Sequence, residues 1–521
     1  MKRKITYEVN GKTYKRKARY IPLRFTFAVL VGLAATLLVI AVVVALCLFV
    51  PYSFIPLIII HFAVVLQIIA SENNPDFKIP WLVLILCLPV VGFMLYYMFA
   101  QRKLRKKFVK RLNALQGISY NHDDEGSFDK LEKENAVAYT QAEALCKIAN
   151  THAFAGVKQK YFSSGEDMFK AMCEDLIKAE KFVFMEYFII EQGVFWTTLL
   201  EILKEKVARG VEVRVVYDDI GCMKTLHGNY VRTLNKMGIK ATVFSRLRGK
   251  ADSEFNNRSH RKITVIDGKI GYTGGINLAD EYINETVRFG HWKDGGIRLE
   301  GQAVAELTKL FLTDYYINVR KPDMCDTDYF PDCERAEESG VVIPFGDGPR
   351  PIYERRVGKT VIQNILNGAT EYAYITTPYV IIDNELCTAI ENTALRGVKV
   401  KIIVPHIPDK KVIFAMTRSY YPRLLKAGVE IYEYGAGFVH LKSYLADGKI
   451  GMIGTINLDY RSLVHHFENG VWMYGCDCLN DLKRDMDETL EKCIRIYPEN
   501  LKRNLASRFF CSLIKIFAPL M

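Results

Sequence analysis

One short pattern of chemically capable residues occurs twice in the chain. The pattern is His-x-Lys-x4-Asp, and its copies, 180 residues apart, are His260, Lys262, Asp267 and His440, Lys442, Asp447. An imidazole can attack phosphorus or carry a proton, and a lysine can hold an anion. Two copies facing each other would supply a nucleophile, a general acid and paired cations. Those groups are the equipment for breaking and remaking a phosphodiester.

Each copy continues into glycine and then asparagine, at Asn277 and Asn457. Their side-chain amides can donate hydrogen bonds to phosphate oxygens. Asp294 and Glu468 follow the first and the second histidine by a few tens of residues. We expect each acid to orient the histidine that precedes it.

The chemistry needs a neutral imidazole to attack and a protonated imidazole to release the leaving group, so we expect opposite protonation states in the two histidines. The lysines and asparagines would stabilise the transition state, and no metal or cofactor is required. As members of the two motifs, Asp267 and Asp447 are included with the candidate catalytic residues His260, Lys262, His440 and Lys442. They stand next to glycine, however, a position that favours turn formation over direct chemistry. Asp218 and Asp219 could be mistaken for a metal site, but paired acids at a strand end are more often loop caps.

The body of the chain alternates strands with helices, which indicates an α/β fold. In the first half we expect strands at 182–190 and 210–217 around a helix at 195–208. The second half repeats this order at 374–380, 384–395 and 397–404. The tripeptide Arg209-Gly210-Val211 matches Arg396-Gly397-Val398, so the repeat is a whole domain.

The N-terminal part contains three apolar runs, at 25–50, 51–70 and 79–100, and each is about long enough to cross a bilayer core of roughly 30 Å as a helix. The middle run could instead be re-entrant or interfacial. Residues 1–24 carry nine Lys/Arg and one Glu, and residues 101–112 carry seven Lys/Arg and no acid. Basic flanks are typical of the cytoplasmic side and of contact with anionic lipids. Two cytoplasmic flanks require an even number of membrane crossings. Therefore either one of the three runs is re-entrant, or one basic flank does not lie on the cytoplasmic side.

The net charge of +12 is concentrated in those two flanks, and the remaining chain is nearly balanced. A balanced catalytic body argues against a nuclease, so no nucleic acid partner is expected. The 12 cysteines are scattered, without disulfide or zinc spacing. This suits a reducing compartment, and we expect a multi-pass protein of the cell membrane with cytoplasmic catalytic domains. The sequence leaves the oligomeric state open, a homo-oligomer included.

The predicted division of the chain has seven parts. They are a basic N-terminal segment (1–24), a membrane region with two or three apolar helices (25–100), a basic and polar linker (101–150), a first domain (151–320), a linker (321–340), a second domain (341–498) and an amphipathic tail (499–521). The tail could lie in the membrane interface or pack on the domain core.

The doubled motif resembles the phospholipase D superfamily, and within it the chain resembles the bacterial cardiolipin synthases along nearly its whole length. The matching segments are Trp81 to Tyr97, Tyr217 to Gly221, Asn257 to Lys262, Thr377 to Tyr379, Tyr420 to Leu425 and Gly437 to Lys442. The resemblance implies two α/β/α sandwich domains related by a pseudo-two-fold axis, with the active site between them. It also implies His260 as the nucleophile and His440 as the acid and base. The presence of three apolar runs, where relatives usually show two membrane helices, and Thr455, in place of a second glycine, depart from the family pattern.

The activity implied by the resemblance is phosphatidyl transfer between two phosphatidylglycerol molecules, giving cardiolipin and glycerol. Its partners would be phosphatidylglycerol, other anionic lipids and the membrane itself. Two alternatives remain open, a hydrolytic phospholipase D and a non-enzymatic lipid-binding scaffold. The acceptor lipid cannot be identified from the residues.

Overall fold

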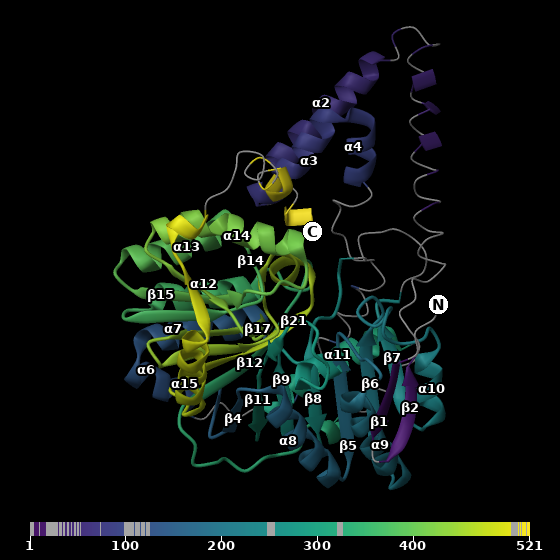
Figure 1. The fold of residues 1–521 in the computed structure, drawn as a ribbon, viewed down its shortest axis with the longest axis vertical. Coiled ribbons are helices and arrows are strands. Elements are labelled where there is room, and N and C mark those ends of the chain that lie inside the picture. Colours follow the sequence, from purple (N-terminus) through teal and green to yellow (C-terminus); the bar gives the residue numbers. More distant parts are fainter. Residues whose placement is uncertain are drawn as a thin grey trace.

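A computed structural model shows an α/β body from which a group of apolar helices projects (Figure 1). The described residues are 5–9, 11–16, 54–72, 74–97, 126–246, 256–319, 327–501, 513–516 and 518–520, with isolated positions elsewhere. The predicted apolar run at 25–50 and the basic segment at 101–112 lie outside them, apart from such isolated positions.

The body is built on two mixed sheets whose strands follow the same order. The first sheet runs β4 (Lys158–Phe162), β11 (Gly296–Glu300), β9 (Ile270–Gly274), β8 (Lys262–Ile266), β5 (Phe182–Tyr187), β6 (Glu212–Asp218) and β7 (Lys240–Phe244). The second runs β3 (Phe154–Ala155), β12 (Val341–Asp347), β21 (Glu468–Tyr474), β19 (Ile450–Gly454), β18 (Ser443–Ala446), β13 (Tyr372–Thr376), β15 (Lys399–Pro405), β16 (Glu430–Tyr434) and β22 (Cys493–Ile496). From β12 to β16 the second sheet reproduces the first, which confirms the predicted repeat.

Helices connect and cover these strands in both halves. They are α8 (Gly165–Lys178), α9 (Val194–Ala208), α10 (Tyr230–Lys236) and α11 (Val304–Asn318) in the first half, and α12 (Val357–Gly368), α13 (Asn384–Leu395), α14 (Lys411–Lys426) and α15 (Cys478–Glu491) in the second. The repeated Arg-Gly-Val tripeptide ends α9 and α13, because Gly210 (φ +89°) and Gly397 (φ +91°) adopt the left-handed conformation that closes a helix. The next strand then starts at once, so the local sequence explains the repeated βαβ unit.

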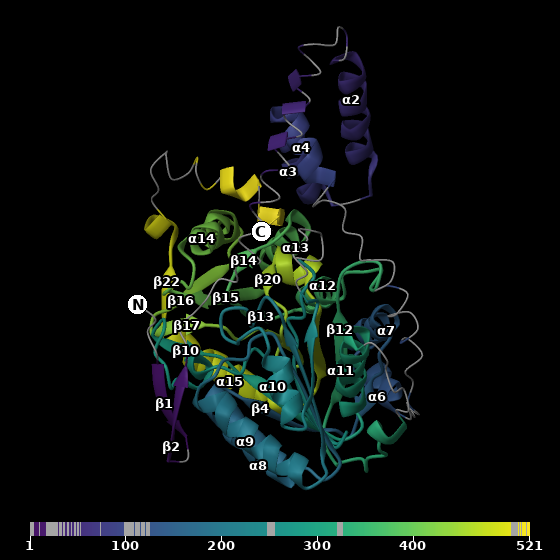
Figure 2. The same ribbon diagram turned by 90° about the vertical axis from the view of Figure 1, so that its right-hand side faces the viewer.

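The two halves share one hydrophobic cluster. Phe311 of α11 packs there with Val265 of the first sheet, Val342 and Met473 of the second, and Leu479 of α15. The helices α11 and α15 thus lie between the sheets and fix their relative position (Figure 2). We call this shared hydrophobic contact the seam between the halves. A site formed by residues of both halves needs such a contact to hold those residues in place.

The segment predicted as a linker is partly a component of the second domain. Its later part forms α6 (Ser127–Glu134) and α7 (Ala136–Ala149), and Leu131 and Leu145 are buried in the core of the second sheet. The following strand β3 pairs with β12 through Ala155 and Val341. The composition predicts a basic and polar linker here because these helices bury only a narrow face.

The apolar N-terminal region forms three described helices, α2 (Phe54–Ala70), α3 (Pro75–Cys87) and α4 (Pro89–Leu95). The predicted helix over 79–100 is interrupted at Leu88, because Pro89 cannot donate a backbone hydrogen bond and disfavours helical geometry in the residue before it. Within the part of the chain that the structure describes, none of the helices combines the length and the apolar character needed to span a membrane.

The first turn of α3 is attached to the second domain. Asp76 Oδ2 accepts hydrogen bonds from Tyr460 Oη at 3.1 Å and from the backbone N–H of Asn384 at 2.9 Å. Phe77 is buried and its ring lies edge-on to that of Tyr460, at 5.3 Å between centroids. The apolar helices are therefore fixed to the body at one end and project away from it.

Both ends of the chain also contact the body. A hairpin of β1 (Ile5–Val9) and β2 (Lys12–Arg16) lies beside α9. In the tail, Ala518 is buried in the core of the second domain and Lys515 Nζ lies 4.0 Å from the ring centroid of Tyr420. Of the two expectations for the tail, the described residues support packing on the domain.

Candidate active site

Each copy of the motif is a β-hairpin, β8–β9 in the first half and β18–β19 in the second. The Asp-Gly pairs form the tight turns, with φ of +53° and +70° at Asp267 and Gly268 and of +52° and +65° at Asp447 and Gly448. Two consecutive left-handed residues match the twist of a hairpin, and Asp-Gly is a preferred pair for this turn. The histidine stands just before the first strand of each hairpin.

The carboxylates of Asp267 and Asp447 bind backbone rather than a reacting group, which corrects their inclusion with the catalytic residues. Asp267 accepts from the N–H groups of Glu180, Lys181 and Phe182 at 2.7–2.8 Å. Asp447 accepts equivalently from residues 370–372 at 2.8–2.9 Å. Each aspartate closes the far end of its hairpin, about five residues, or roughly 16 Å, beyond the motif lysine.

Each histidine is bound by an acid from the opposite half of the chain. His260 Nδ1 lies 2.9 Å from Glu468 Oε2, and His440 Nδ1 lies 2.7 Å from Asp294 Oδ2. The prediction that each acid orients the preceding histidine was therefore wrong in its pairing, although both acids were identified. A carboxylate on Nδ1 holds the imidazole in the tautomer that leaves Nε2 for chemistry.

Backbone pairing between the halves explains this crossed arrangement. The N–H of His260 donates to the carbonyl of Phe467 at 2.8 Å, and the N–H of His440 donates to the carbonyl of Lys293 at 2.7 Å. In both cases the next residue after the acceptor is the acid. Next to the pair of His440 and Asp294, the strands β10 (His291–Lys293) and β17 (Gly437–Val439) form a short parallel ladder, which extends the backbone pairing between the halves.

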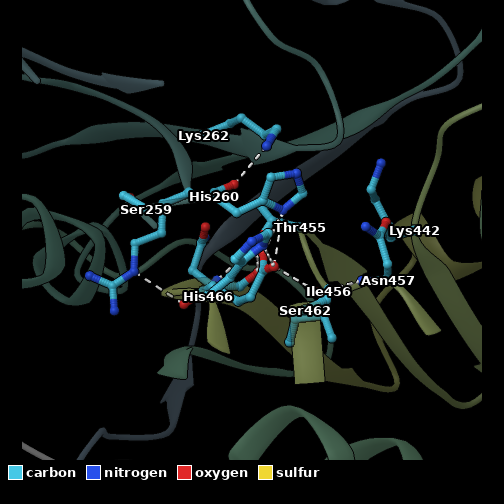
Figure 3. A network of polar contacts seen from close by, with 12 residues as sticks. Ser259, His260, Lys262, Lys442, Thr455, Ile456, Asn457, Ser462 and His466 are labelled. Carbon is cyan, nitrogen blue, oxygen red and sulfur yellow. Dashed lines mark hydrogen bonds and ion pairs between the residues drawn. The ribbon is translucent and has the colours of Figure 1, made fainter. Parts of the chain in front are cut away.

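The two lysines complete a site that both halves share. Lys262 Nζ donates to the carbonyl of His260 at 2.6 Å, and Lys442 Nζ donates to that of His440. Both lysines are buried, and the charge of Lys442 contributes to lowering the pKa of Lys262. Figure 3 shows His260 and Lys262 of the first half together with Lys442 and Asn457 of the second. Lysines from both copies of the motif therefore contribute to one buried site.

Burial and neighbouring charges shift the pKa values of the site strongly. Burial, together with the charge of the motif lysine beside each ring, lowers the pKa of His260 to about 3 and that of His440 to about 4, although the paired carboxylates act in the opposite direction. Burial likewise lowers the pKa of Lys262 to about 7 and of Lys442 to about 8. Both imidazoles are therefore neutral in the free site near pH 7, whereas the sequence predicted opposite protonation states.

The orienting acids stay ionised despite their burial. Burial by itself raises the pKa of a carboxyl group, but the paired imidazole outweighs this effect and leaves the pKa of Glu468 and of Asp294 below the usual range. An ionised acid behind each ring can stabilise an imidazolium once a substrate anion brings further negative charge to the site.

The two asparagines differ in what they leave for a ligand. Asn277 Oδ1 accepts from the N–H of Ile189 at 3.0 Å, and its Nδ2 donates to Tyr282 Oη at 2.7 Å. Asn457 is buried, and its Oδ1 has no hydrogen-bond partner among the described residues. That oxygen can accept a hydrogen bond from a hydroxyl group of a ligand, whereas both polar atoms of the Asn277 amide are engaged within the protein.

Several residues around the site escaped the sequence prediction. Ser462 Oγ donates to Glu468 Oε1 at 2.6 Å, and Thr455 Oγ1 donates to Glu468 Oε2. The ring of His466 lies 5.4 Å from that of His260, and its Nδ1 is 3.5 Å from Glu468 Oε1. The only signal for them was Thr455, the position at which the second motif departs from the first.

The departure at Thr455 follows from the size of the two acids. A side chain at the corresponding Gly275 would place its Cβ 2.0 Å from Asp294 Oδ1. The longer Glu468 leaves space for a threonine, which donates a hydrogen bond to it. The two halves thus hold their acids differently.

Outside the immediate site, Asp218 forms a structural cap, as its position at a strand end predicted. It pairs with Arg258 Nε at 2.9 Å and accepts from the N–H of Ile220 at 2.9 Å and of Gly221 at 3.0 Å. Arg258 lies two residues before His260 and so anchors the start of the motif.

One cluster in the described part of the chain has the spacing of a metal site. The ligand-type atoms of His260, His466 and Glu468 lie within 4.8 Å of one another. Hydrogen bonds from His260, Ser462 and Thr455 already engage both oxygens of Glu468. The proposed phosphodiester chemistry uses these groups as they stand.

Comparison with known proteins agrees with this geometry. A family model described as cardiolipin synthase, PLD-like domain, matches residues 172–287 and 362–490, and a second, described as phospholipase D-nuclease N-terminal, matches residues 57–101. A solved structure, the phosphatidylserine synthase of Haemophilus influenzae Rd KW20, shares the fold with a TM-score of 0.56 and 14% sequence identity, covering 73% of this chain and 98% of that one. The fold and the doubled hairpin define a phospholipase D-like protein.

Relatives of similar length narrow the class. The chain is 42% identical to an uncharacterized protein of Streptococcus mutans, covering 88% of this chain and 99% of that protein. It is 32% identical to a cardiolipin synthase of a Geobacillus species, covering 87% and 91%. It is also 30% identical to cardiolipin synthase 2 of Bacillus anthracis, covering 87% and 88%. The chain belongs to the cardiolipin synthase family of phospholipase D-like proteins.

Proposed function

We propose that this protein is a cardiolipin synthase, which transfers a phosphatidyl group from one phosphatidylglycerol to another and releases glycerol. The observation that carries the proposal is the pair of histidines from separate halves, each held at Nδ1 by an acid of the other half. That arrangement leaves two Nε2 atoms for one phosphorus. The named cardiolipin synthases among the relatives support the choice of substrate.

In the first step, Nε2 of neutral His260 attacks the phosphorus of the donor phosphatidylglycerol. The bond from phosphorus to the glycerol oxygen breaks, and His440, protonated in the occupied site, gives its proton to that oxygen. Glycerol leaves, and the phosphatidyl group remains on His260. The assignment of His260 as the nucleophile follows the resemblance to the family.

In the second step, His440 takes the proton from a hydroxyl of the second phosphatidylglycerol, whose oxygen attacks phosphorus. The bond from phosphorus to His260 breaks, which restores the neutral imidazole and yields cardiolipin. Lys262 and Lys442 hold the non-bridging oxygens through both steps and offset the charge that develops on them. Asn457 can add an amide hydrogen bond.

The same proposal places the protein at the cell membrane, because both substrates are lipids. The described apolar helices support this placement, since α2 exposes Ile55, Ile58, Ile59 and Phe62. We further propose cytoplasmic catalytic domains, on the basis of the basic segments at 1–24 and 101–112. Protease accessibility in sealed right-side-out vesicles tests this sidedness, and cleavage of the catalytic body from outside would contradict it.

The activity itself is tested with purified full-length protein and vesicles of isotope-labelled phosphatidylglycerol, analysed by mass spectrometry. We expect cardiolipin and glycerol in equal amounts, and neither product from His260→Ala or His440→Ala. Phosphatidic acid without cardiolipin would identify a hydrolytic phospholipase D instead. Unchanged product formation in both alanine variants would overturn the catalytic assignment.

A further inference from the structure

The two halves differ at the residue two positions before each acid. In the first half this residue is Trp292, whose ring lies 5.6 Å from that of His440. In the second half it is His466, whose ring lies 5.4 Å from that of His260. The places are equivalent, but only one of them carries a nitrogen that can bind a metal ion. The surroundings of His260 therefore contain a second imidazole that can bind a metal ion, whereas the surroundings of His440 contain an indole that cannot.

Near His260 the potential metal ligands are two imidazoles and one carboxylate, those of His260, His466 and Glu468. The central member of this set is Glu468, whose Oε1 lies 3.0 Å from His260 Nδ1 and 3.5 Å from His466 Nδ1. All three ligand-type atoms fall within 4.8 Å of one another, and His466 is buried like the other two. Two histidines and one glutamate with an open fourth position are a well-known ligand set for zinc.

We propose that His260, His466 and Glu468 bind a divalent transition-metal ion of the zinc class, and that the bound ion blocks the active site. Tetrahedral coordination with bonds of about 2.1 Å separates ligand atoms by roughly 3.4 Å. The two distances from Glu468 bracket this value, so mainly the two imidazoles have to approach each other, by at most about 1.5 Å. Hydrogen bonds from Ser462 and Thr455 hold the carboxylate as outer-shell partners do in metal sites.

Inhibition follows from the atom that the metal occupies. When the ion binds Nδ1 of His260, the proton of that nitrogen moves to Nε2 of the same ring. Nε2 is the atom that attacks phosphorus in the proposed reaction, and once protonated it has no lone pair to offer. A lipid phosphodiester and the metal ion therefore exclude each other at His260. Metal binding does not depend on the proposed function, whereas its inhibitory effect rests on it.

Binding is tested on the full-length protein in detergent, stripped of metal and titrated with Co2+ alone. We expect one Co2+ per chain with the intense visible bands of tetrahedral coordination, and their loss when Zn2+ is added. His466→Asn and His466→Gln should each weaken Co2+ binding by at least about tenfold, because they remove one ligand. Two variants are made because one of the two substitutions could prevent folding. Circular dichroism shows whether each variant is folded.

A matched control is His406→Asn. His406 Nδ1 also contacts a buried glutamate, Glu433, at 2.9 Å, but it belongs to neither motif. Co2+ affinity should stay unchanged in this variant. Absence of stoichiometric Co2+ binding in the wild type, or equal affinity in the wild type and a folded His466 variant, would overturn the metal site.

The inhibitory role has a separate readout, cleavage of labelled phosphatidylglycerol with and without Zn2+. Zn2+ should inhibit the wild type and the His406 variant at least about tenfold more strongly than any His466 variant that retains turnover. Stoichiometric binding without any loss of turnover would overturn the inhibitory role alone. A wild type that binds Co2+ but never turns over phosphatidylglycerol would instead count against the proposed function.

Discussion

Glu468 lies 2.9 Å from Nδ1 of His260, although the two residues belong to opposite halves of the chain. Asp294 and His440 repeat the relationship in reverse, at 2.7 Å. For the two motif histidines, neither half thus supplies both the imidazole and its carboxylate partner. A change in the seam between the halves must affect both histidines together.

The crossed acids should matter for rate more than for substrate binding. In Glu468→Gln or Asp294→Asn the paired imidazole loses its negative partner, so an imidazolium is less stable. We expect kcat to fall by about 10²- to 10⁴-fold, as when a triad aspartate becomes asparagine, with KM changed far less. Initial rates of cardiolipin formation measure this effect. A tenfold or smaller loss in folded protein would contradict the role of the acid.

The turn aspartates should behave in the opposite way. Asp267→Asn removes a charged acceptor from three backbone N–H groups, and we expect the free energy of unfolding to fall by about 1–2 kcal/mol. Because the carboxylate lies at the far end of the hairpin, kcat should change by less than about threefold. Thermal denaturation and rate measurements on the same preparation separate the two effects. A large loss of kcat at unchanged stability would return Asp267 to the catalytic residues.

Alkaline pH should weaken lipid binding before it damages the fold. With pKa values of about 7 and about 8, Lys262 and Lys442 are charged below these values and become neutral as pH rises through them. The empty site therefore loses positive charge between about pH 7 and pH 8. KM for phosphatidylglycerol should rise over this interval.

The variant Lys442→Arg provides the comparison for that prediction, because a guanidinium stays charged at every pH used. The KM of this variant should be higher than that of the wild type at neutral pH, because a planar guanidinium differs in shape from the ammonium group that it replaces. Its further increase with pH should, however, be smaller. Parallel pH profiles for the two proteins would show that Lys442 is not responsible.

Gly275 should tolerate no side chain. An added Cβ would stand 2.0 Å from Asp294 Oδ1, so Gly275→Ala must push the acid away from His440. We expect a loss of kcat similar to that of Asp294→Asn. Thr455→Ala is the matched change in the other half, where space exists, and it should cost less than about tenfold. Equal losses in the two variants would contradict the asymmetry of the two acids.

The attachment of α3 should matter for substrate that is embedded in a bilayer. Tyr460→Phe removes one of the two hydrogen bonds to Asp76 Oδ2, with an expected cost of about 1 kcal/mol. Turnover of short-chain phosphatidylglycerol in micelles should be nearly unchanged, and turnover in vesicles should fall. A matched loss in both systems would place the effect at the active site rather than at the attachment.

Much of the catalytic body could be predicted because its signals are local. The helix over 384–395 was predicted with the bounds that α13 shows, and the strand at 182–190 corresponds to β5. The doubled motif identified both histidines and both lysines, and the two orienting acids were found downstream of its two copies. Periodicity and turn chemistry determine such features within a few residues.

Other features depend on contacts that are distant in the sequence. The pairing of Glu468 with His260 follows from how the halves face each other, and spacing within one half favours the wrong histidine. His466 had no signal, because its role arises only from its distance to the other ring. The break at Leu88 was missed because composition dominated over the local effect of Pro89.

The contribution of β3 and α6–α7 to the second sheet has a consequence for biosynthesis. These residues leave the ribosome before the first half does, yet β12, the strand that β3 pairs with, is made only after that half. Their apolar face therefore stays without its partner while nearly two hundred further residues are translated. Such an interval invites aggregation or chaperone binding, so the order of synthesis, and not stability alone, should limit the yield of this protein.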